Sequence, residues 1–265
     1  IKPMDLQEYQ EKRIKEGKSP ATVDMEICIA RTVINKAFYN DMVSGHTLKA
    51  FQRVDRKLKK GSNARKRTLT FNEYLSLYEV APIHIKAILE IGFYTGMRLG
   101  EIRELQWKHI DRKKGFINLP ADMTKEGKEK KIPINDRVET VLSGLVRSLT
   151  YDNVILYRGT PIQHKTGVKK GLEAACKKAG ILYGRKEENG FTFHDIRRTV
   201  KTNMMNAGID KAIRDTILGH SLQGMDVHYI VPSDEMLTRA MGQYTAWVEN
   251  QIEEQIKKQG NLGNI

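Results

Sequence analysis

A short basic stretch divides this chain and limits what it can fold into. Between residues 53 and 67, eight side chains are lysine or arginine and only Asp55 opposes them. Gly61, Ser62 and Asn63 lie in the middle of the stretch and favour a flexible break. A chain of 265 residues is long enough for two ordinary domains. The break therefore predicts one domain over residues 1–66 and a second over residues 67–265.

The first domain is predicted to be all helical. Ser19 followed by Pro20 is typical of a helix start. Apolar side chains then recur at helical spacing and form one stripe: Val23, Ile27, Ala30, Ile34 and Ala37. Residues 1–66 hold 15 Lys and Arg against 8 Asp and Glu, a net charge of +7 out of +13 for the whole chain. The smaller domain carries the greater charge density, which favours a module that grips nucleic acid over an enzyme core.

The basic stretch itself allows two interpretations. A run of charges is more often a solvated face than a binding strip. At a domain joint in so basic a protein, contact with nucleic-acid phosphates is an equal alternative. The candidate contacts are Arg53, Arg56, Lys57, Lys59, Lys60, Arg65, Lys66 and Arg67.

The two cysteines and the hydropathy pattern bear on where the protein works. Cys28 and Cys176 stand far apart and follow no metal-ligand or redox spacing, so free thiols in a reducing cytoplasm are expected. We find no apolar run long enough to cross a membrane and no signal peptide at the amino end. Because the sequence opens on Ile1 rather than Met, a segment upstream of it is left open.

The second domain mixes helices with one small sheet. Thr70 and Glu73 fit a capping box, and residues 83–94 predict a strongly apolar helix that ends at a threonine and Gly96. Over residues 109–134 the period changes: residues 116–119 and 130–134 predict short strands around a turn at Glu126 and Gly127, joined by residues 107–111. The fold class is therefore mainly α with a small antiparallel β-sheet.

A long final helix is predicted over residues 234–258. Its apolar positions are more numerous than a solvent-facing tail requires: Met236, Ala240, Tyr244, Trp247, Ile252 and Ile256. We expect this helix to dock on a neighbouring protomer. Tyr244 lies on the apolar stripe and is interpreted as a packing residue.

One stretch of the second domain predicts a phosphate site. His194 and Arg197 stand three apart and share a helix face, and Thr192 with Asp195 fits a capping box that would start the helix just before them. The first-turn amide groups and the positive end of the helix dipole add to these cations.

Taken together, five short motifs resemble the tyrosine recombinase family, in its phage and mobile-element integrase branch. Residues 95–102 resemble its first arginine box, with Arg98. Residues 123–134 are similar to its lysine-bearing hairpin and residues 194–199 to its second box. His220 follows a leucine and a glycine, as the third motif requires, and Tyr229 nine residues on fits the nucleophile. Residues 1–66 are similar to the helical core-binding domain and residues 67–265 to the catalytic domain, whereas nothing resembles an arm-site-binding domain.

The resemblance implies a role for each matching residue. Tyr229 would attack the scissile phosphate and form a 3′-phosphotyrosyl intermediate. Planar, permanently charged guanidinium groups suit the developing phosphorane, and the histidines would donate to the same oxygens or move the tyrosine proton. A hairpin lysine would protonate the leaving oxygen; Lys125 is favoured and Lys128 is the alternative. The implied catalytic set is Arg98, Lys125, His194, Arg197, His220 and Tyr229, with Glu101 orienting Arg98.

The implied function is site-specific DNA recombination without metal, ATP or another cofactor. Arg198 and Lys128 are expected to contact DNA, although Arg198 could instead be a salt-bridge partner. The implied partners are double-stranded DNA with inverted-repeat core sites, three further protomers in a tetrameric synapse, and accessory DNA-bending or excision factors. Two alternatives stay open: a catalytically silent DNA-binding regulator on the same fold, and a relaxase similar to type IB topoisomerases.

Overall fold

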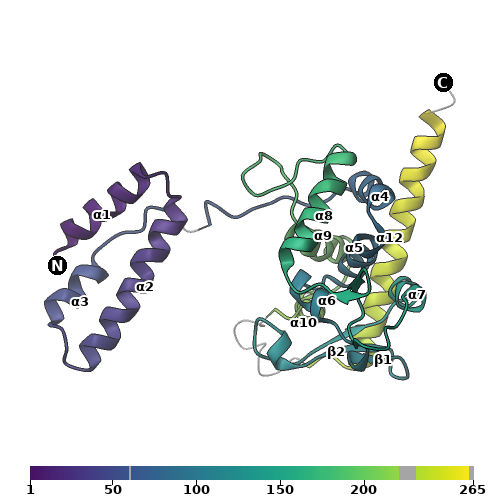
Figure 1. The fold of residues 1–265 in the computed structure, drawn as a ribbon, viewed down its shortest axis with the longest axis horizontal. Coiled ribbons are helices and arrows are strands. Elements are labelled where there is room, and N and C mark those ends of the chain that lie inside the picture. The colour runs from purple at the N-terminus through teal and green to yellow at the C-terminus, as the bar shows by residue number, and fades with distance from the viewer. Residues whose placement is uncertain (60, 221–230, 263–265) are drawn as a thin grey trace. The chain divides into compact units, whose positions relative to one another are not determined.

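A computed structural model describes residues 1–59, 61–220 and 231–262, with side chains to residue 258 (Figure 1). Lys60 and Tyr229 lie outside the described residues. The chain forms two compact units, Ile1–Lys66 and Arg67–Ile265, here called unit 1 and unit 2. Among the described helices, none is long and apolar enough to cross a membrane.

Unit 1 consists of three helices around a small core. These are α1 (Pro3–Lys15), α2 (Pro20–Tyr39) and α3 (Gly45–Gln52). The hydroxyl of Ser19 accepts from an amide of the first turn of α2, as the sequence predicts. The apolar stripe of α2 faces the core, which also takes in Leu6 of α1 and Phe51 of α3. An ion pair between Arg13 and Glu26 joins α1 to α2 at 2.6 Å.

The helix α5 (Ile83–Thr95) lies at the centre of unit 2. Ten of its 13 residues are buried, because it packs against α6 (Leu99–Glu104), α7 (Asp136–Gly144), α8 (Lys165–Lys178) and α9 (Phe193–Asn206). A helix that is apolar on all sides removes its side chains from water only when it is buried inside a core. Before it, α4 (Phe71–Val80) begins at the predicted capping box, with the Glu73 amide donating to the Thr70 hydroxyl at 3.2 Å.

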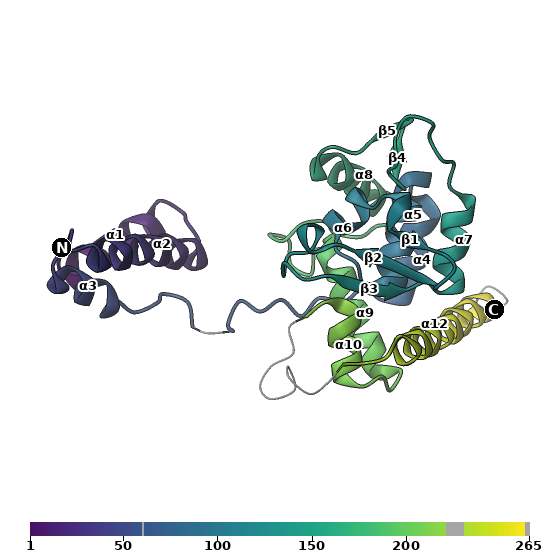
Figure 2. The same ribbon diagram turned by 90° about the horizontal axis from the view of Figure 1, so that it is seen from below.

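The predicted sheet is present, with one correction. The strands β1 (Ile110–Asp111), β2 (Phe116–Leu119) and β3 (Lys130–Pro133) pair antiparallel in that order (Figure 2). The segment Trp107–His109 is a 3₁₀ turn, not part of a strand. A second 3₁₀ turn, Ala121–Met123, precedes the hairpin tip. The sequence analysis missed the hairpin of β4 (Leu156–Tyr157) and β5 (Thr160–Pro161), since two-residue strands carry no alternating pattern.

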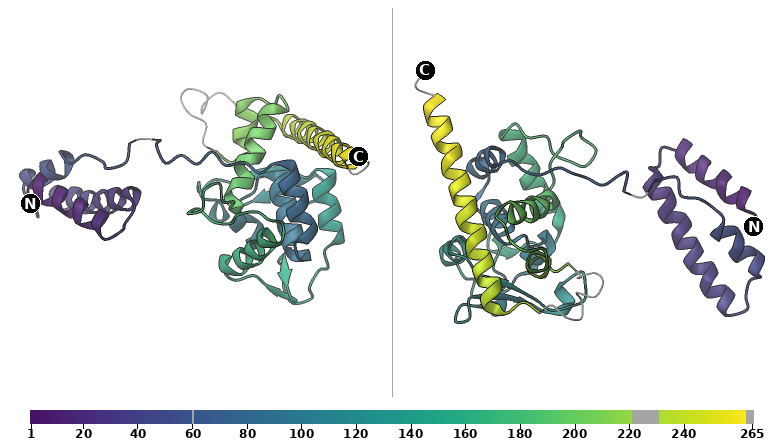
Figure 3. Two further views of the ribbon diagram at one scale, coloured as in Figure 1. Left: turned by 90° about the horizontal axis from the view of Figure 1, so that it is seen from above. Right: turned by 180° about the vertical axis from the view of Figure 1, so that it is seen from behind.

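The final helix α12 (Asp234–Leu262) lies along the outside of unit 2 in both views of Figure 3. It packs against β3, α4, α9 and α10 (Lys211–Leu218). Ala240, Tyr244 and Ile252 are buried there, and the Tyr244 hydroxyl donates to the carbonyl of Phe93 at 2.7 Å. Tyr244 is thus a packing residue, as predicted. Most of the apolar stripe packs inside unit 2. The stripe therefore no longer supports docking on a neighbouring protomer, and that docking stays a prediction.

Candidate active site

Arg98 begins helix α6 directly after the end of α5. Gly96 ends α5 with a φ of +68°, and a Cβ there would lie 2.3 Å from a side-chain atom of Leu218, so only glycine fits. The Arg98 amide donates to Glu101 Oε2 at 2.9 Å and its guanidinium donates to Oε1 at 2.8 Å. The contact expected between Glu101 and Arg98 is therefore present.

The tip of the β2–β3 hairpin contributes a carboxylate to Arg98. Glu126 accepts from both terminal nitrogens of the guanidinium, one of them at 3.0 Å. Gly127 turns the tip with a φ of +63°. Lys125 and Lys128, the two predicted acids, are exposed on either side of Glu126, and neither ammonium has a hydrogen bond or ion pair with the described residues. The structure thus brings Glu126, rather than a lysine, onto Arg98.

The sequence analysis missed Lys130, a buried lysine in the same site. Its side chain is 3% exposed and its ammonium donates to Glu101 Oε2 at 2.9 Å. Burial lowers the pKa of Lys130 to about 8; the charge and hydrogen bond of Glu101 oppose this shift, and the charges of Arg197 and Arg98 add to it. The stem of Lys130 runs beneath Gly219, where a Cβ would lie 2.9 Å from it. In the sequence, the only indication that Lys130 belongs to the site was its position within a predicted strand.

Helix α9 supplies Arg197 and His194. The Thr192 amide and hydroxyl donate to Asp195 at 2.8 Å and 2.9 Å, which starts the helix as predicted. Arg197 is buried and donates to the carbonyls of Gly96, at 2.8 Å, and Leu218. Burial and the nearby charge of Arg98 lower its pKa to about 10. The side chain of His194 is partly exposed; partial loss of water around its ring lowers its pKa, and the charges of Arg198 and Arg197 lower it further.

His220 lies at the end of α10, beside a buried carboxylate. Its Nδ1 is 3.2 Å from Asp215 Oδ1, which also accepts from Lys201 at 2.7 Å. Burial alone would raise the pKa of Asp215, but the hydrogen bonds from Lys201, Lys211 and His220 lower it to about 2. The pKa of His220 is lowered by burial and by the charge of Arg197. The carboxylate therefore fixes the orientation of the imidazole while the ring stays neutral near pH 7.

Several predicted DNA contacts have partners inside their own unit. Arg198 pairs with Asp195, so the salt-bridge alternative holds for this residue. Arg67 pairs with Glu73 and is 13% exposed. The side chain of Lys57 lies 4.0 Å from a glutamate of α1. The remaining described cations of the basic stretch stay candidates; Arg65 is half-buried, and the exposed ones are Arg53, Arg56, Lys59 and Lys66.

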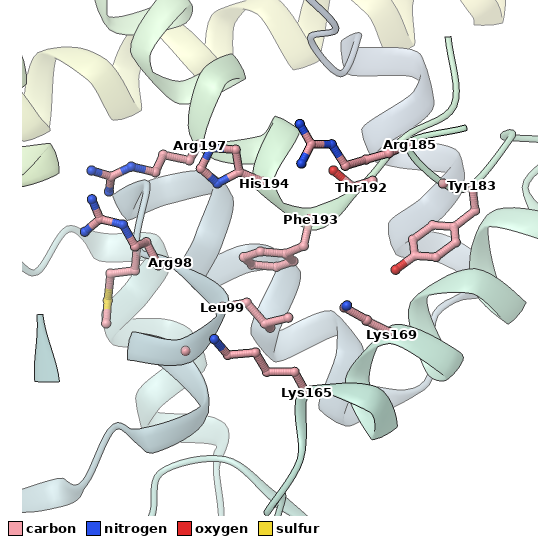
Figure 4. A pocket seen from close by; sticks show the side chains of 13 residues that line it. Arg98, Leu99, Lys165, Lys169, Tyr183, Arg185, Thr192, Phe193, His194 and Arg197 are labelled. Atoms are coloured by element: carbon pink, nitrogen blue, oxygen red, sulfur yellow. The ribbon is translucent and has the colours of Figure 1, made fainter. Parts of the chain in front are cut away.

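Arg98, His194 and Arg197 line one pocket of about 460 Å³ (Figure 4). They come from the start of α6 and from α9, far apart in the chain. Guanidinium groups held this way can bind a phosphate and stabilise charge that develops on it. Tyr229 lies outside the described residues, so its position relative to the pocket is not described. In the described part of the chain, no three His, Cys, Asp or Glu side chains gather as metal ligands.

Comparison with known proteins identifies relatives of this chain. Residues 67–236 match the phage integrase family. Tyrosine recombinase XerA of Pyrococcus furiosus is 30% identical over 158 residues, which cover 58% of this chain and 54% of that protein. The matched region covers 59% of the length of the curated integrases of Escherichia phages HK022 and lambda and of Enterobacteria phage 434.

Solved structures share the fold. A lambda integrase(75-356) dimer bound to a COC′ core site superposes with a TM-score of 0.66 at 20% identity, covering 91% of this chain and 80% of that one. A lambda integrase tetramer bound to a Holliday junction also gives 0.66, at 21% identity, covering 85% and 63%. The mainly helical fold with a small antiparallel sheet is that of these integrases. By its match over most of unit 2, this chain belongs to the phage integrase family.

Proposed function

We propose that this protein is a site-specific DNA recombinase that acts as an integrase. It cuts and rejoins DNA strands through a covalent 3′-phosphotyrosyl intermediate. The observation that carries the proposal is the convergence of Arg98, His194 and Arg197 on one pocket from separate segments. That convergence supplies fixed positive charge and a neutral imidazole around a space suited to a phosphate.

The proposed chemistry is an attack by the Tyr229 phenolate on the scissile phosphorus. The bond from phosphorus to the 5′-oxygen breaks, and the 3′-phosphate stays on the tyrosine. Arg98 and Arg197 stabilise the charge of the phosphorane. His220, which Asp215 orients, accepts the phenol proton or donates to a phosphoryl oxygen. The covalent bond keeps the energy of the broken one, so neither ATP nor a metal is part of the proposal.

Lys125 is proposed to give a proton to the leaving 5′-oxygen. It directly precedes Glu126, and the contact of Glu126 with Arg98 holds the hairpin tip at the edge of the pocket. Lys128 remains the alternative.

The DNA partners of this chain are proposed from its relatives. Integrases of the same fold are bound to a core site as a dimer and to a Holliday junction as a tetramer. We propose that four copies of this chain assemble on two pairs of inverted half-sites, with accessory DNA-bending or excision factors. Its place of action would be the cytoplasm, on nucleoid DNA.

A nicked duplex that carries the target site tests the proposal. After cleavage the fragment beyond the nick diffuses away, so a covalent protein–DNA adduct that survives denaturation accumulates. Tyr229→Phe should abolish the adduct and leave the dissociation constant within about twofold. Tyr244→Phe is the control and should keep forming it. Binding without any adduct would instead support the catalytically silent regulator.

A supercoiled plasmid separates the recombinase from the relaxase. A recombinase should exchange strands only between paired sites, whereas a relaxase would remove supercoils as a monomer from any plasmid.

The contribution of the basic stretch is tested by replacing Lys57, Lys59 and Lys60 with methionine. The slope of log K against log salt should flatten by about 0.9 for each phosphate that the variant no longer neutralises. An unchanged slope would mean that these lysines are a solvated surface.

A further inference from the structure

The pocket extends well beyond the three residues that would hold the scissile phosphate. We call this extension the flanking pocket and define it by Leu99, Lys165, Lys169, Tyr183, Arg185 and Phe193. Lys165 and Lys169 reach into it from α8, and Arg185 comes from the loop before α9 (Figure 4). Phe193 and Tyr183 give it an apolar wall between these cations.

The cations of the flanking pocket are uncompensated. Among the described residues, no hydrogen bond or ion pair engages the side-chain nitrogens of Lys165, Lys169 or Arg185. The ammonium of Lys165 lies close to Gly100, 3.5 Å from the position that a Cβ of this glycine would occupy. A side chain at Gly100 would fill the space between this ammonium and the first turn of α6. The three side chains are exposed to solvent, and their charges around a cavity with an apolar wall favour an anion that also carries apolar surface.

The two lysines lie close enough together to reach the same phosphate group. Lys165 and Lys169 stand four apart and share one face of α8, about 6 Å along its axis. A deoxyribose between two phosphates supplies the apolar surface that the ring of Phe193 would contact.

We propose that the flanking pocket binds the backbone phosphate next to the scissile phosphate on the cleaved strand, with the deoxyribose between the two phosphates against Tyr183 and Phe193. This inference rests on the proposed function, because the scissile phosphate is placed at Arg98 and Arg197. The flanking pocket would position the strand for attack without touching the reacting atoms. Its lysines are therefore binding residues, not catalytic ones.

Salt dependence gives the first test. Lys165 and Lys169 are both changed to methionine, and binding of the full chain to a short mixed-sequence duplex is measured over a range of salt concentrations. The slope of log K against log salt should fall by about 0.9, because the two lysines together would neutralise one phosphate. The control is Lys170→Met with Lys178→Met, the same charge change on the same helix, since neither residue lines the flanking pocket. Equal slopes for the two double variants would overturn the inference.

A neutral linkage in the DNA locates the contact. In the nicked duplex that yields the covalent adduct, single phosphates of the cleaved strand are replaced in turn by methylphosphonates. Replacement of the phosphate next to the scissile one should weaken wild-type binding about tenfold, and the double variant of Lys165 and Lys169 much less. Coupling at a distant phosphate, on the other strand, or at none would overturn the inference.

The two tests also separate this inference from the proposed function. If the adduct forms but no coupling is found, the recombinase stands and the flanking pocket is wrong. If no adduct forms, the salt slopes still decide whether the lysines bind phosphate.

Discussion

Replacing Lys130 by methionine should make unit 2 more stable. The buried site gathers the charges of Arg98, Arg197 and Lys130 around Glu101 and Glu126, and Lys130 is the most deeply enclosed of the cations. Methionine has a similar length and fills the same space beneath Gly219 without a charge. Glu101 is not stranded by the change, because Arg98 still donates to it from its amide and its guanidinium.

The expected magnitude follows from the pKa of Lys130. A fall in the pKa from 10.5 to about 8 means that burying the ammonium destabilises the folded state by about 3 kcal/mol. A neutral lysine could still hydrogen-bond to Glu101 and methionine cannot, which subtracts about 1 kcal/mol. We therefore expect a stabilisation of about 2 kcal/mol at pH 7.

The sign of this stability change can be checked by measuring how the change depends on pH. Below pH 8 Lys130 is charged in both states, so its destabilising effect is fully present. Between pH 8 and pH 10.5 the unfolded chain binds more protons than the folded one, so wild-type stability rises relative to the variant. The advantage of the variant should shrink over that window.

The assay is urea unfolding followed by tryptophan fluorescence. Both tryptophans, Trp107 and Trp247, lie in unit 2, so the signal reports this unit alone. Lys131→Met is the matched control. Lys131 pairs with Asp234 and both side chains are about half exposed, so loss of this pair should change stability by less than about 1 kcal/mol. A destabilisation by Lys130→Met, or an effect that does not diminish above pH 8, would refute the reasoning.

Three further changes address other parts of the site. Glu126→Gln removes the carboxylate that occupies Arg98, so duplex binding should tighten, by about tenfold in a filter or anisotropy assay; unchanged affinity would mean that the pair does not compete with phosphate. Because the pKa of Asp215 is lower in the folded state, its ionised carboxylate stabilises the fold above pH 4, and this stabilisation is lost as the pH falls towards 2. Acid unfolding should therefore show a loss of about 2 kcal/mol in the free energy of unfolding, and Asp215→Asn should lack this loss. Gly96→Ala should destabilise unit 2 by about 3 kcal/mol or more in urea, whereas Gly115→Ala, with a φ of +71° in open space, should cost about 1 kcal/mol.

The sequence predicted local structure where one segment carries its own signal. The starts of α2, α4 and α9 are set by a capping side chain a few residues from the groups it satisfies, and each is present. The glycine-marked end of α5 likewise needs only a local backbone conformation. The β4–β5 hairpin lacked any such local signal.

The sequence by itself determined the family, the mainly helical fold, the helix starts and the identity of the two arginines in the pocket, because each is written in neighbouring residues. Only the tertiary structure decided which charges meet. Glu126 covers Arg98, Lys130 enters the site beneath Gly219, and the apolar stripe of α12 is used inside unit 2. Such contacts join segments that lie from tens of residues to more than a hundred residues apart in the chain. Their strength depends on how deeply the groups are buried, and no local pattern in the sequence encodes that burial.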